Sequence, residues 1–326
     1  MTEPILQVKD LRTYFHVKEG VLKAVDGVSY FLNAGETLGL VGESGCGKSV
    51  SALSILQLVD QPPAEIHSGK ILFQGENLLN LTEKEMRNVR GLSISMIFQE
   101  PMTSLNPIIS IGRQISEVLT IHQGLSWKEA RKRTVDLLKL VGIPLPEKRI
   151  EEYPHQLSGG MRQRVMIAIA VACDPKVLIA DEPTTALDVT IQAQILDLMM
   201  GLQEELGTAI LLITHDLGVI AEAAKRVAVM YAGKIVEEAD VITIFKDPLH
   251  PYTQGLIRSV PRIDMAGEQN RLEEIPGIVP NLYYLPKGCA FFERCPAGSK
   301  QCQQEEPKLL SVGDGHWVRC WIYKDD

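Results

Sequence analysis

Long apolar runs are missing from this sequence. None of its 326 residues lies in a stretch that approaches the roughly 20 apolar residues needed to cross a bilayer. The first residues also lack the basic and then apolar pattern of a secretory signal peptide. We therefore expect a chain that stays in the cytosol and reaches a membrane only through an embedded partner.

Positive charge is scarce as well. The 33 Lys and Arg residues are outnumbered by 41 Asp and Glu residues, which gives a net charge of -8. Broad nucleic-acid binding usually needs a basic face that neutralises phosphates, so this balance argues against a nucleic-acid partner. Internal repeats and low-complexity tracts are not evident either.

Cysteine is infrequent, but most of it is clustered. Two of the six cysteines stand alone and four lie near the C-terminal end: Cys46 and Cys173, and then Cys289, Cys295, Cys302 and Cys320. Because a reducing cytosol disfavours disulfides, clustered thiols indicate metal ligands first. Four thiolates suit zinc or an iron–sulfur cluster, and the alternative is four reduced thiols without a ligand. The C-x2–4-C pairs usual for structural zinc are missing, but spacing alone leaves both metals open.

Several apolar segments predict an α/β core. Residues 37–41 form a short apolar run before a glycine-rich turn, and residues 51–56 then have helical spacing. Residues 177–180 and 209–213 are continuous apolar runs, as expected of strands buried on both faces of a parallel sheet. Between them, apolar positions from Ile191 to Leu206 follow spacings of three and four and end at Gly207, which predicts an amphipathic helix.

The residue pattern changes at two points after the first predicted strands. Between about 101 and 154 strand-like runs vanish, and residues 126–129 (SWKE) have the pattern of a capping box that opens a helix. Past residue 240, prolines are frequent and long periodic segments are few. We predict an α/β domain over 1–240, with a helical subdomain at about 100–165, and a small irregular C-terminal domain over 241–326 that holds the four cysteines.

Residues 42–49 (GESGCGKS), hereafter the phosphate loop, match the pattern G-x-x-x-x-G-K-S/T between a strand and a helix. Glycines let backbone N–H groups surround a phosphate, and the helix adds its positive end. Lys48 would supply charge to the β- and γ-phosphates, and Ser49 a hydroxyl to Mg²⁺. Cys46 fills a variable position. The alternative is a glycine-rich turn that binds nothing.

Two acids follow the apolar strand at 177–180. Asp181 is placed to hold Mg²⁺, and Glu182 to polarise the attacking water as general base or as its electrostatic orienter. After the next strand, His215 is placed to contact the γ-phosphate. Each of these three residues could instead be an ordinary polar residue at the end of a strand. The phosphate loop upstream favours the catalytic interpretation.

Residues 157–164 (LSGGMRQR) resemble the signature motif of the ABC ATPase family and lie between the phosphate loop and the acidic strand, as that family requires. The resemblance covers about residues 5–240 and implies a P-loop NTPase fold with a mixed sheet. It implies that Gln99 is the Q-loop glutamine and Asp188 the D-loop aspartate. It also implies that two chains pair head to tail, so that each nucleotide meets the partner's signature residues, Ser158, Gly159, Gly160 and Gln163.

In this family the adenine is expected to stack on an aromatic ring near the first strand. Tyr14 and Phe15 are adjacent candidates, and counting from Leu11 favours Phe15. Strand alternation allows only one of the two to face the base. The expected nucleotide-binding set is Tyr14, Phe15, Gly42, Ser44, Gly45, Cys46, Gly47, Lys48, Ser49 and Val50.

The C-terminal part indicates the cargo. Residues 250–256 (HPYTQGL) and 275–280 (IPGIVP) resemble the tails of dipeptide and oligopeptide importer ATPases, and sometimes those of nickel importers. This resemblance implies a subunit on the cytoplasmic face of the membrane, with a second, paralogous ATPase subunit, two integral-membrane permease subunits and an extracytoplasmic peptide-binding protein. It also implies a 4Fe-4S cluster on the four cysteines, with zinc as the alternative.

Other functions compete with peptide import. Within the same family the cargo could be nickel or another small solute. ABC ATPases of DNA repair and chromosome structure carry a long coiled-coil insertion, and those of translation carry two ATPase units, and neither trace is present in the sequence. A redox sensor or electron carrier with a regulatory ATPase is the alternative from another class.

Overall fold

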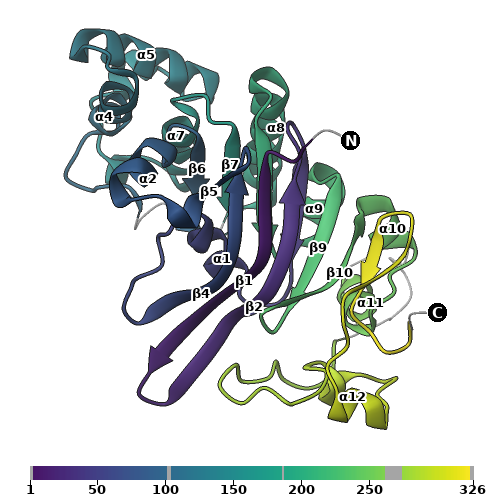
Figure 1. The fold of residues 1–326 in the computed structure, drawn as a ribbon. Coiled ribbons are helices and arrows are strands. Elements are labelled where there is room, and N and C mark those ends of the chain that lie inside the picture. Colours follow the sequence, from purple (N-terminus) through teal and green to yellow (C-terminus); the bar gives the residue numbers. More distant parts are fainter. Residues whose placement is uncertain (1–2, 101–103, 186, 261–273, 324–326) are drawn as a thin grey trace, which may run out of the picture. The chain divides into compact units, whose positions relative to one another are not determined.

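The structure, a computed structural model, describes residues 3–100, 104–185, 187–260 and 274–323 (Figure 1). The chain divides into two compact units that each combine distant segments. The first unit comprises Met1–Leu6, Leu32–Glu36 and Phe73–Ile213. The second unit comprises Gln7–Phe31, Thr37–Leu72 and Thr214–Asp326. The division at residue 240 expected from the sequence stays a prediction.

Three parallel strands form the centre of the first unit. In the order β6 (Ile94–Ile97), β7 (Val177–Asp181) and β8 (Ala209–Thr214), they place Ile97 opposite Ala180 and Asp181 opposite Ile213. Every residue of β7 and β8 is buried. The apolar runs at 177–180 and 209–213 are therefore buried parallel strands, as predicted.

Helix α8 (Val189–Leu206) connects β7 to β8 and confirms the predicted amphipathic helix. It buries Ile195, Met199 and Leu202, and ends at Gly207, whose φ of 64° lies in the left-handed region. A glycine adopts this conformation without the steric penalty of a Cβ.

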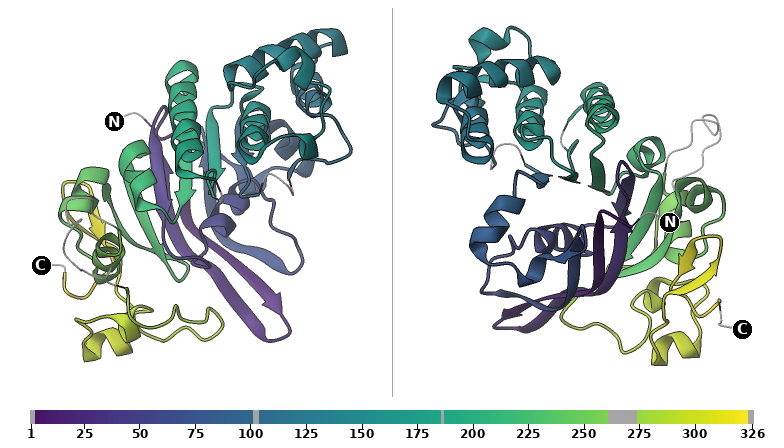
Figure 2. Two further views of the ribbon diagram at one scale, coloured as in Figure 1. Left: turned by 180° about the vertical axis from the view of Figure 1, so that it is seen from behind. Right: turned by 45° about the horizontal axis from the view of Figure 1, so that its top comes forward.

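The described elements between β6 and β7 are all helical, as predicted. Helices α4 (Ile111–Gln123), α5 (Trp127–Leu140) and α7 (Gly159–Val171) pack against one another, and Figure 2 shows them grouped in teal. The capping box is present: Ser126 Oγ accepts the Glu129 N–H at 3.4 Å, and the Glu129 carboxylate accepts the Ser126 N–H at 3.0 Å. Shorter helical segments of this unit are α2 (Glu83–Val89), α6 (Pro146–Arg149) and the 3-10 turns Leu78–Asn80 and Pro154–Gln156.

The second unit contains two sheets. In one, β3 (Thr37–Val41) runs parallel to β9 (Arg226–Tyr231), and β9 pairs antiparallel with β10 (Lys234–Asp240). This sheet is therefore mixed, as expected. The other has the order β2-β1-β4 within this unit, from β2 (Gly20–Leu32), β1 (Leu6–Val17) and β4 (Ala64–Phe73). The second unit also contains the helices α1 (Lys48–Ile55), α9 (Leu217–Ala223), α10 (Val241–Lys246), α11 (Pro251–Arg258) and α12 (Lys300–Gln304).

The C-terminal segment is more regular than the sequence indicated. Strands β11 (Leu310–Gly313) and β12 (His316–Val318) form a hairpin whose second strand pairs antiparallel with β10. Buried Glu237 on β10 anchors this region, because its carboxylate accepts the N–H groups of Leu249 and His250 and lies 2.8 Å from His316 Nε2. The hairpin was missed because strands of three and four residues carry too little alternation to be recognised.

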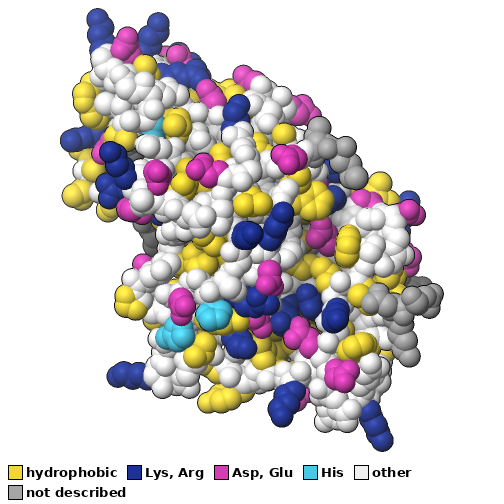
Figure 3. All heavy atoms as spheres, in the orientation of Figure 1, with side chains coloured by type: hydrophobic (Ala, Val, Ile, Leu, Met, Phe, Trp, Pro, Cys, Tyr) yellow, Lys and Arg dark blue, Asp and Glu magenta, His cyan; other side chains and the backbone are white. Residues whose placement is uncertain are grey.

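None of the helices among the described residues is long and apolar enough to cross a membrane. On the face drawn in Figure 3, Lys and Arg side chains are interspersed with Asp and Glu side chains.

Candidate functional site

The phosphate loop joins β3 to α1 in the second unit, in the predicted strand–loop–helix arrangement. Its glycines are required by close backbone contacts. A Cβ on Gly47, whose φ is 104°, would lie 2.1 Å from the Ala24 carbonyl oxygen, and one on Gly42 would lie 2.1 Å from the Met230 carbonyl oxygen. No side chain fits at such distances, so both positions need glycine.

Lys48 lies inside the curve of this loop, and only 5% of it is exposed. Its Nζ donates to the Gly42 carbonyl at 2.7 Å and to the Glu43 carbonyl at 3.1 Å. When a phosphate binds in the loop, the ammonium can exchange these carbonyl oxygens for phosphate oxygens with only a small movement of the side chain. Cys46 is fully buried beside it, and burial raises the pKa of its thiol. It acts here as a small apolar residue, since only the thiolate is reactive.

The two aromatic candidates on β1 differ in their surroundings. Tyr14 is buried, its hydroxyl donates to Asp26 Oδ1 at 2.8 Å, and its ring stacks on His67 at 5.0 Å. Phe15 is half-buried. The ring of Tyr14 is therefore already engaged within the protein, whereas part of Phe15 remains accessible to a base.

The acidic residues lie in the first unit. Asp181 is the last residue of β7 and is 4% exposed. The carboxylate of Glu182 follows it and accepts hydrogen bonds from Gln99 Nε2 at 2.9 Å and Thr185 Oγ1 at 2.9 Å. Glu182 also has a φ of 47°, a left-handed conformation that is uncommon for a residue with a Cβ and that recurs at functional sites. Thr185 is a contact that the sequence analysis missed.

The signature residues lie at the start of helix α7. Ser158 caps the helix by accepting the Met161 N–H at 3.3 Å, which leaves the amides of its first turn at a positive helix end. Gly160 allows close packing, because a Cβ there would lie 2.8 Å from Ile191. Gln163 is only 2% exposed, and its Nε2 has no hydrogen-bond partner among the described residues.

The remaining predicted residues are at element ends. Exposed Asp188 caps α8 by accepting the Ile191 N–H at 3.0 Å, while Ala186 of the same motif lies outside the described residues. Exposed His215 follows β8. The phosphate loop, Tyr14, Phe15 and His215 thus belong to the second unit, and Gln99, Asp181, Glu182, Asp188 and the signature residues belong to the first.

The four clustered cysteines converge in the second unit. Cys289, Cys295, Cys302 and Cys320 line one small cavity together with His250. The pKa of Cys289 is raised to about 11, mainly by burial and to a smaller extent by the neighbouring thiols. Burial likewise raises the pKa of Cys295 and of Cys320. Even so, no group of three or more His, Cys, Asp and Glu side chains within the described ranges is arranged to hold a single metal ion.

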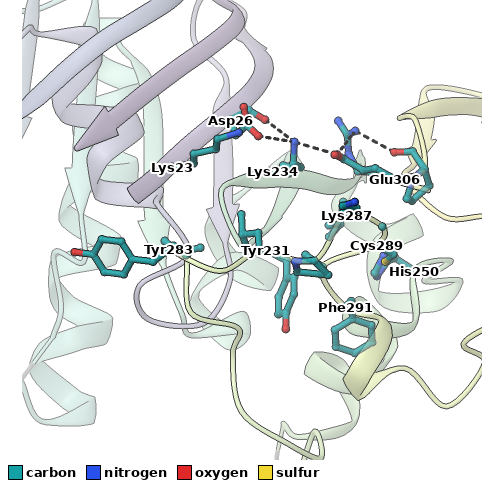
Figure 4. A pocket seen from close by; sticks show the side chains of 18 of the residues that line it. Lys23, Asp26, Tyr231, Lys234, His250, Tyr283, Lys287, Cys289, Phe291 and Glu306 are labelled. Carbon is teal, nitrogen blue, oxygen red and sulfur yellow. Dashed lines mark hydrogen bonds and ion pairs between the residues drawn. The ribbon is translucent and has the colours of Figure 1, made fainter. Parts of the chain in front are cut away.

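A second cavity of about 400 Å³ lies between β2, β10 and the C-terminal segment (Figure 4). No residue of the phosphate loop lines it. Lys234 lines this cavity and forms ion pairs with Asp26 at 3.0 Å and with Glu306 at 3.0 Å, as the dashed lines show. Tyr231 and Phe291 supply its aromatic side.

The comparisons with known proteins agree with this geometry. Residues 25–185 match the family described as ABC transporter, and residues 236–302 match the oligopeptide/dipeptide transporter C-terminal region. The chain is 54% identical to the oligopeptide transport ATP-binding protein OppD of Bacillus subtilis, over 99% of this chain and 90% of that protein. It is 50% identical to the dipeptide transport ATP-binding protein DppD of Escherichia coli, over 99% and 98%.

A solved structure also matches. It is a dimeric, post-hydrolysis state of the ATP-binding cassette MJ0796 with ADP and Pi bound, with a TM-score of 0.65 and 28% identity over 72% of this chain and 98% of that one. The predicted fold class is therefore confirmed. The chain belongs to the ABC transporter family, as an ATP-hydrolysing subunit that carries the C-terminal region of oligopeptide and dipeptide transporters.

Proposed function

We propose that the chain hydrolyses ATP to power the import of peptides, as one of two nucleotide-binding subunits on the cytoplasmic face of a membrane transporter. The observation that carries the catalytic part is the carboxylate of Glu182, which Gln99 and Thr185 hold at the end of a buried strand. The cargo rests on the relatives, which are oligopeptide and dipeptide transport proteins.

The roles of the residues follow from their chemistry. Lys48 and the amides of the phosphate loop bind the phosphates, and Ser49 and Asp181 hold Mg²⁺. Glu182 activates the attacking water, while Gln99 orients the carboxylate and His215 contacts the γ-phosphate. Phe15 stacks on the adenine, because the ring of Tyr14 is engaged by His67 and its hydroxyl by Asp26.

Catalysis needs a second subunit in this proposal. The capped N-terminus of α7 presents Ser158 and Gly159 to a phosphate bound in the partner, with Asp188 near the same interface. The partner is a paralogue, and the pair acts on two permease subunits supplied by a peptide-binding protein outside the membrane. The dimeric state of MJ0796 supports the pairing.

We further propose that the four cysteines hold a 4Fe-4S cluster, with zinc as the alternative. Around one tetrahedral zinc ion the sulfurs would stand roughly 3.8 Å apart, given Zn–S bonds of about 2.3 Å. A 4Fe-4S cluster separates its thiolates further, because each binds a different iron. The four thiols line one cavity, and cysteine thiolates are the ligands of such clusters. When bound, the cluster would supply a redox-active centre and cross-link the C-terminal segment.

Uptake measurements in cells test the cargo. A strain deleted for this chain should lose accumulation of labelled di- and oligopeptides and regain it with the wild-type chain. Nickel uptake, measured in the same strains, should not change. Loss of nickel uptake with intact peptide uptake would overturn the peptide assignment in favour of the nickel importer.

A further inference from the structure

The phosphate loop is bound by two residues that lie far along the chain. The backbone N–H of Glu43 donates to the Tyr252 hydroxyl at 2.8 Å. The Glu43 carboxylate accepts two hydrogen bonds from Arg294, at 2.7 Å from Nη1 and 3.0 Å from Nη2. All three residues belong to the second unit.

Arg294 is built into this position by its full set of donors. Besides the two bonds to Glu43, Nε donates to the Pro276 carbonyl at 3.0 Å and Nη1 to the Tyr231 hydroxyl at 3.3 Å. A longer contact of 3.5 Å joins Nη2 to the Ile275 carbonyl. An arginine has five N–H donors, so this guanidinium, whose side chain is only 4% exposed, leaves none unused. Its hydrogen bonds to Glu43 are the main cause of the raised pKa of Arg294.

A cluster of three aromatic rings also lies beside the Arg294 guanidinium. The rings of Tyr231 and Tyr252 lie 4.6 Å apart, and Phe291 packs against both at 5.3 and 5.5 Å. The Arg294 guanidinium lies 5.8 Å from the ring centres of Tyr231 and Phe291. A buried arginine fixed by rings, carbonyls and a carboxylate has a single orientation, unlike a surface ion pair.

Glu43 in turn shapes the part of the loop that meets the phosphates. Its carbonyl accepts the Cys46 N–H at 3.3 Å and the Lys48 ammonium at 3.1 Å. A shift of Glu43 therefore changes both the turn that carries the amides and the rest position of Lys48.

We propose that Arg294 is a positioning residue for the phosphate loop, so that the C-terminal segment completes the nucleotide site of its own chain through Glu43. The proposal rests on the assigned role of residues 42–49 in binding ATP. The positioning role of Arg294 would also explain what the two segments that resemble peptide importers, 250–256 and 275–280, do in the structure. The first supplies Tyr252, and the second supplies the carbonyls that orient Arg294.

Removal of Arg294 would leave the Glu43 carboxylate without its partner. Without Arg294, the Glu43 carboxylate loses both donors beside a mostly buried aromatic cluster, and unpaired charges in such places are costly. The loop relieves this cost by turning Glu43 toward water. Nucleotide binding must then restore the loop, which lowers affinity.

The test is a double-mutant cycle on nucleotide affinity in the full chain, read by titration with a fluorescent ATP analogue. Arg294→Gln and Glu43→Gln should each raise the Kd roughly tenfold, within the usual range of coupling between sites. The double variant should bind about as weakly as either single variant, because the same contact is lost once. Arg294→Lys should be intermediate, since it keeps the charge but not the two-pronged geometry. The control is Arg258→Gln, an exposed arginine on α11 that should bind like the wild type.

Two further readouts separate positioning from folding. In the assembled transporter, Arg294→Gln should raise the KM for ATP and leave kcat nearly unchanged, whereas a partly unfolded population would lower kcat alone. Tyr252→Phe removes only the acceptor of the Glu43 N–H, keeps the ring, and should raise the Kd by a few-fold. This variant carries the test if Arg294→Gln does not fold.

Wild-type Kd values for folded Arg294→Gln and Tyr252→Phe would overturn the proposal, as would effects in the double variant that simply multiply. Lys48→Ala distinguishes this failure from failure of the phosphate loop itself. If Lys48→Ala loses nucleotide binding while the Arg294 variants keep it, the loop assignment stands and only the positioning role is wrong. If Lys48→Ala binds normally, the loop assignment fails.

Discussion

Gln99 Nε2 donates to Glu182 Oε2 at 2.9 Å, and this bond connects the end of β6 to the end of β7. The two residues lie 83 positions apart in the chain. Thr185 Oγ1 reaches the same carboxylate oxygen at 2.9 Å. The proposed base thus has its orientation set by two neutral donors.

Removal of one of these donors should slow turnover without weakening nucleotide binding. We expect Gln99→Ala to lower kcat about tenfold, the scale of one hydrogen bond to a charged group. ATPase assays of the assembled transporter measure this, with exposed Gln123→Ala on α4 as the matched control. A normal kcat for Gln99→Ala would show that this hydrogen bond does not contribute to turnover.

Lys48 provides the strongest prediction for nucleotide binding. Its loss removes charge-assisted hydrogen bonds worth about 1.5–3 kcal/mol, so Lys48→Ala should weaken ATP binding at least roughly tenfold. Isothermal titration of the purified chain measures the affinity. Lys300→Ala, an exposed lysine on α12, serves as control and should bind like the wild type.

The choice between the two aromatics on β1 can be made with one pair of variants. Phe15→Ala should weaken binding of ATP by about 1–3 kcal/mol, the range for one base stacked on an aromatic ring. Tyr14→Phe keeps its ring and loses only the hydroxyl bond to Asp26, so affinity should stay near that of the wild type. Unchanged affinity in Phe15→Ala would contradict the stacking role of Phe15, and weakened binding in folded Tyr14→Ala would then assign the stacking to Tyr14.

The cysteine cavity predicts a cofactor that survives only with all four ligands. Anaerobically purified wild-type chain should contain about four iron and four sulfide per chain and little zinc. Each of Cys289→Ser and Cys302→Ser should lose most of the iron and lower the melting temperature, since metal binding stabilises the fold.

Buried Cys173→Ala, outside the cavity, is the control and should keep its iron. A folded wild-type chain without iron and sulfide would refute the cluster, and one zinc per chain would replace it with the alternative.

How much the sequence revealed depended on the range of the interactions. The phosphate loop, the capping box at Ser126 and helix α8 were predicted because each is encoded by neighbouring residues. The Arg294–Glu43 ion pair was not, since it joins residues 251 positions apart, and Glu43 fills a variable position of the loop pattern. Thr185 was missed for a related reason: a threonine three residues after Glu182 shows its role only when the turn is folded.

The preference for Phe15 shows an intermediate case. The sequence favoured Phe15 by counting along the strand, but Tyr14 remained open because both rings suit a base. The structure adds the contacts that occupy Tyr14, namely His67 and Asp26, which come from other strands of the same sheet.

The most direct test of ATP hydrolysis at this site is the turnover of Glu182→Gln in the assembled transporter. We expect kcat to fall by about 10²–10⁴-fold, the usual contribution of general-base catalysis, while ATP affinity is kept and an ATP-bound dimer accumulates. Glu204→Gln, an exposed glutamate on α8, should hydrolyse ATP like the wild type. Turnover by Glu182→Gln at the wild-type rate would contradict the assigned catalytic centre.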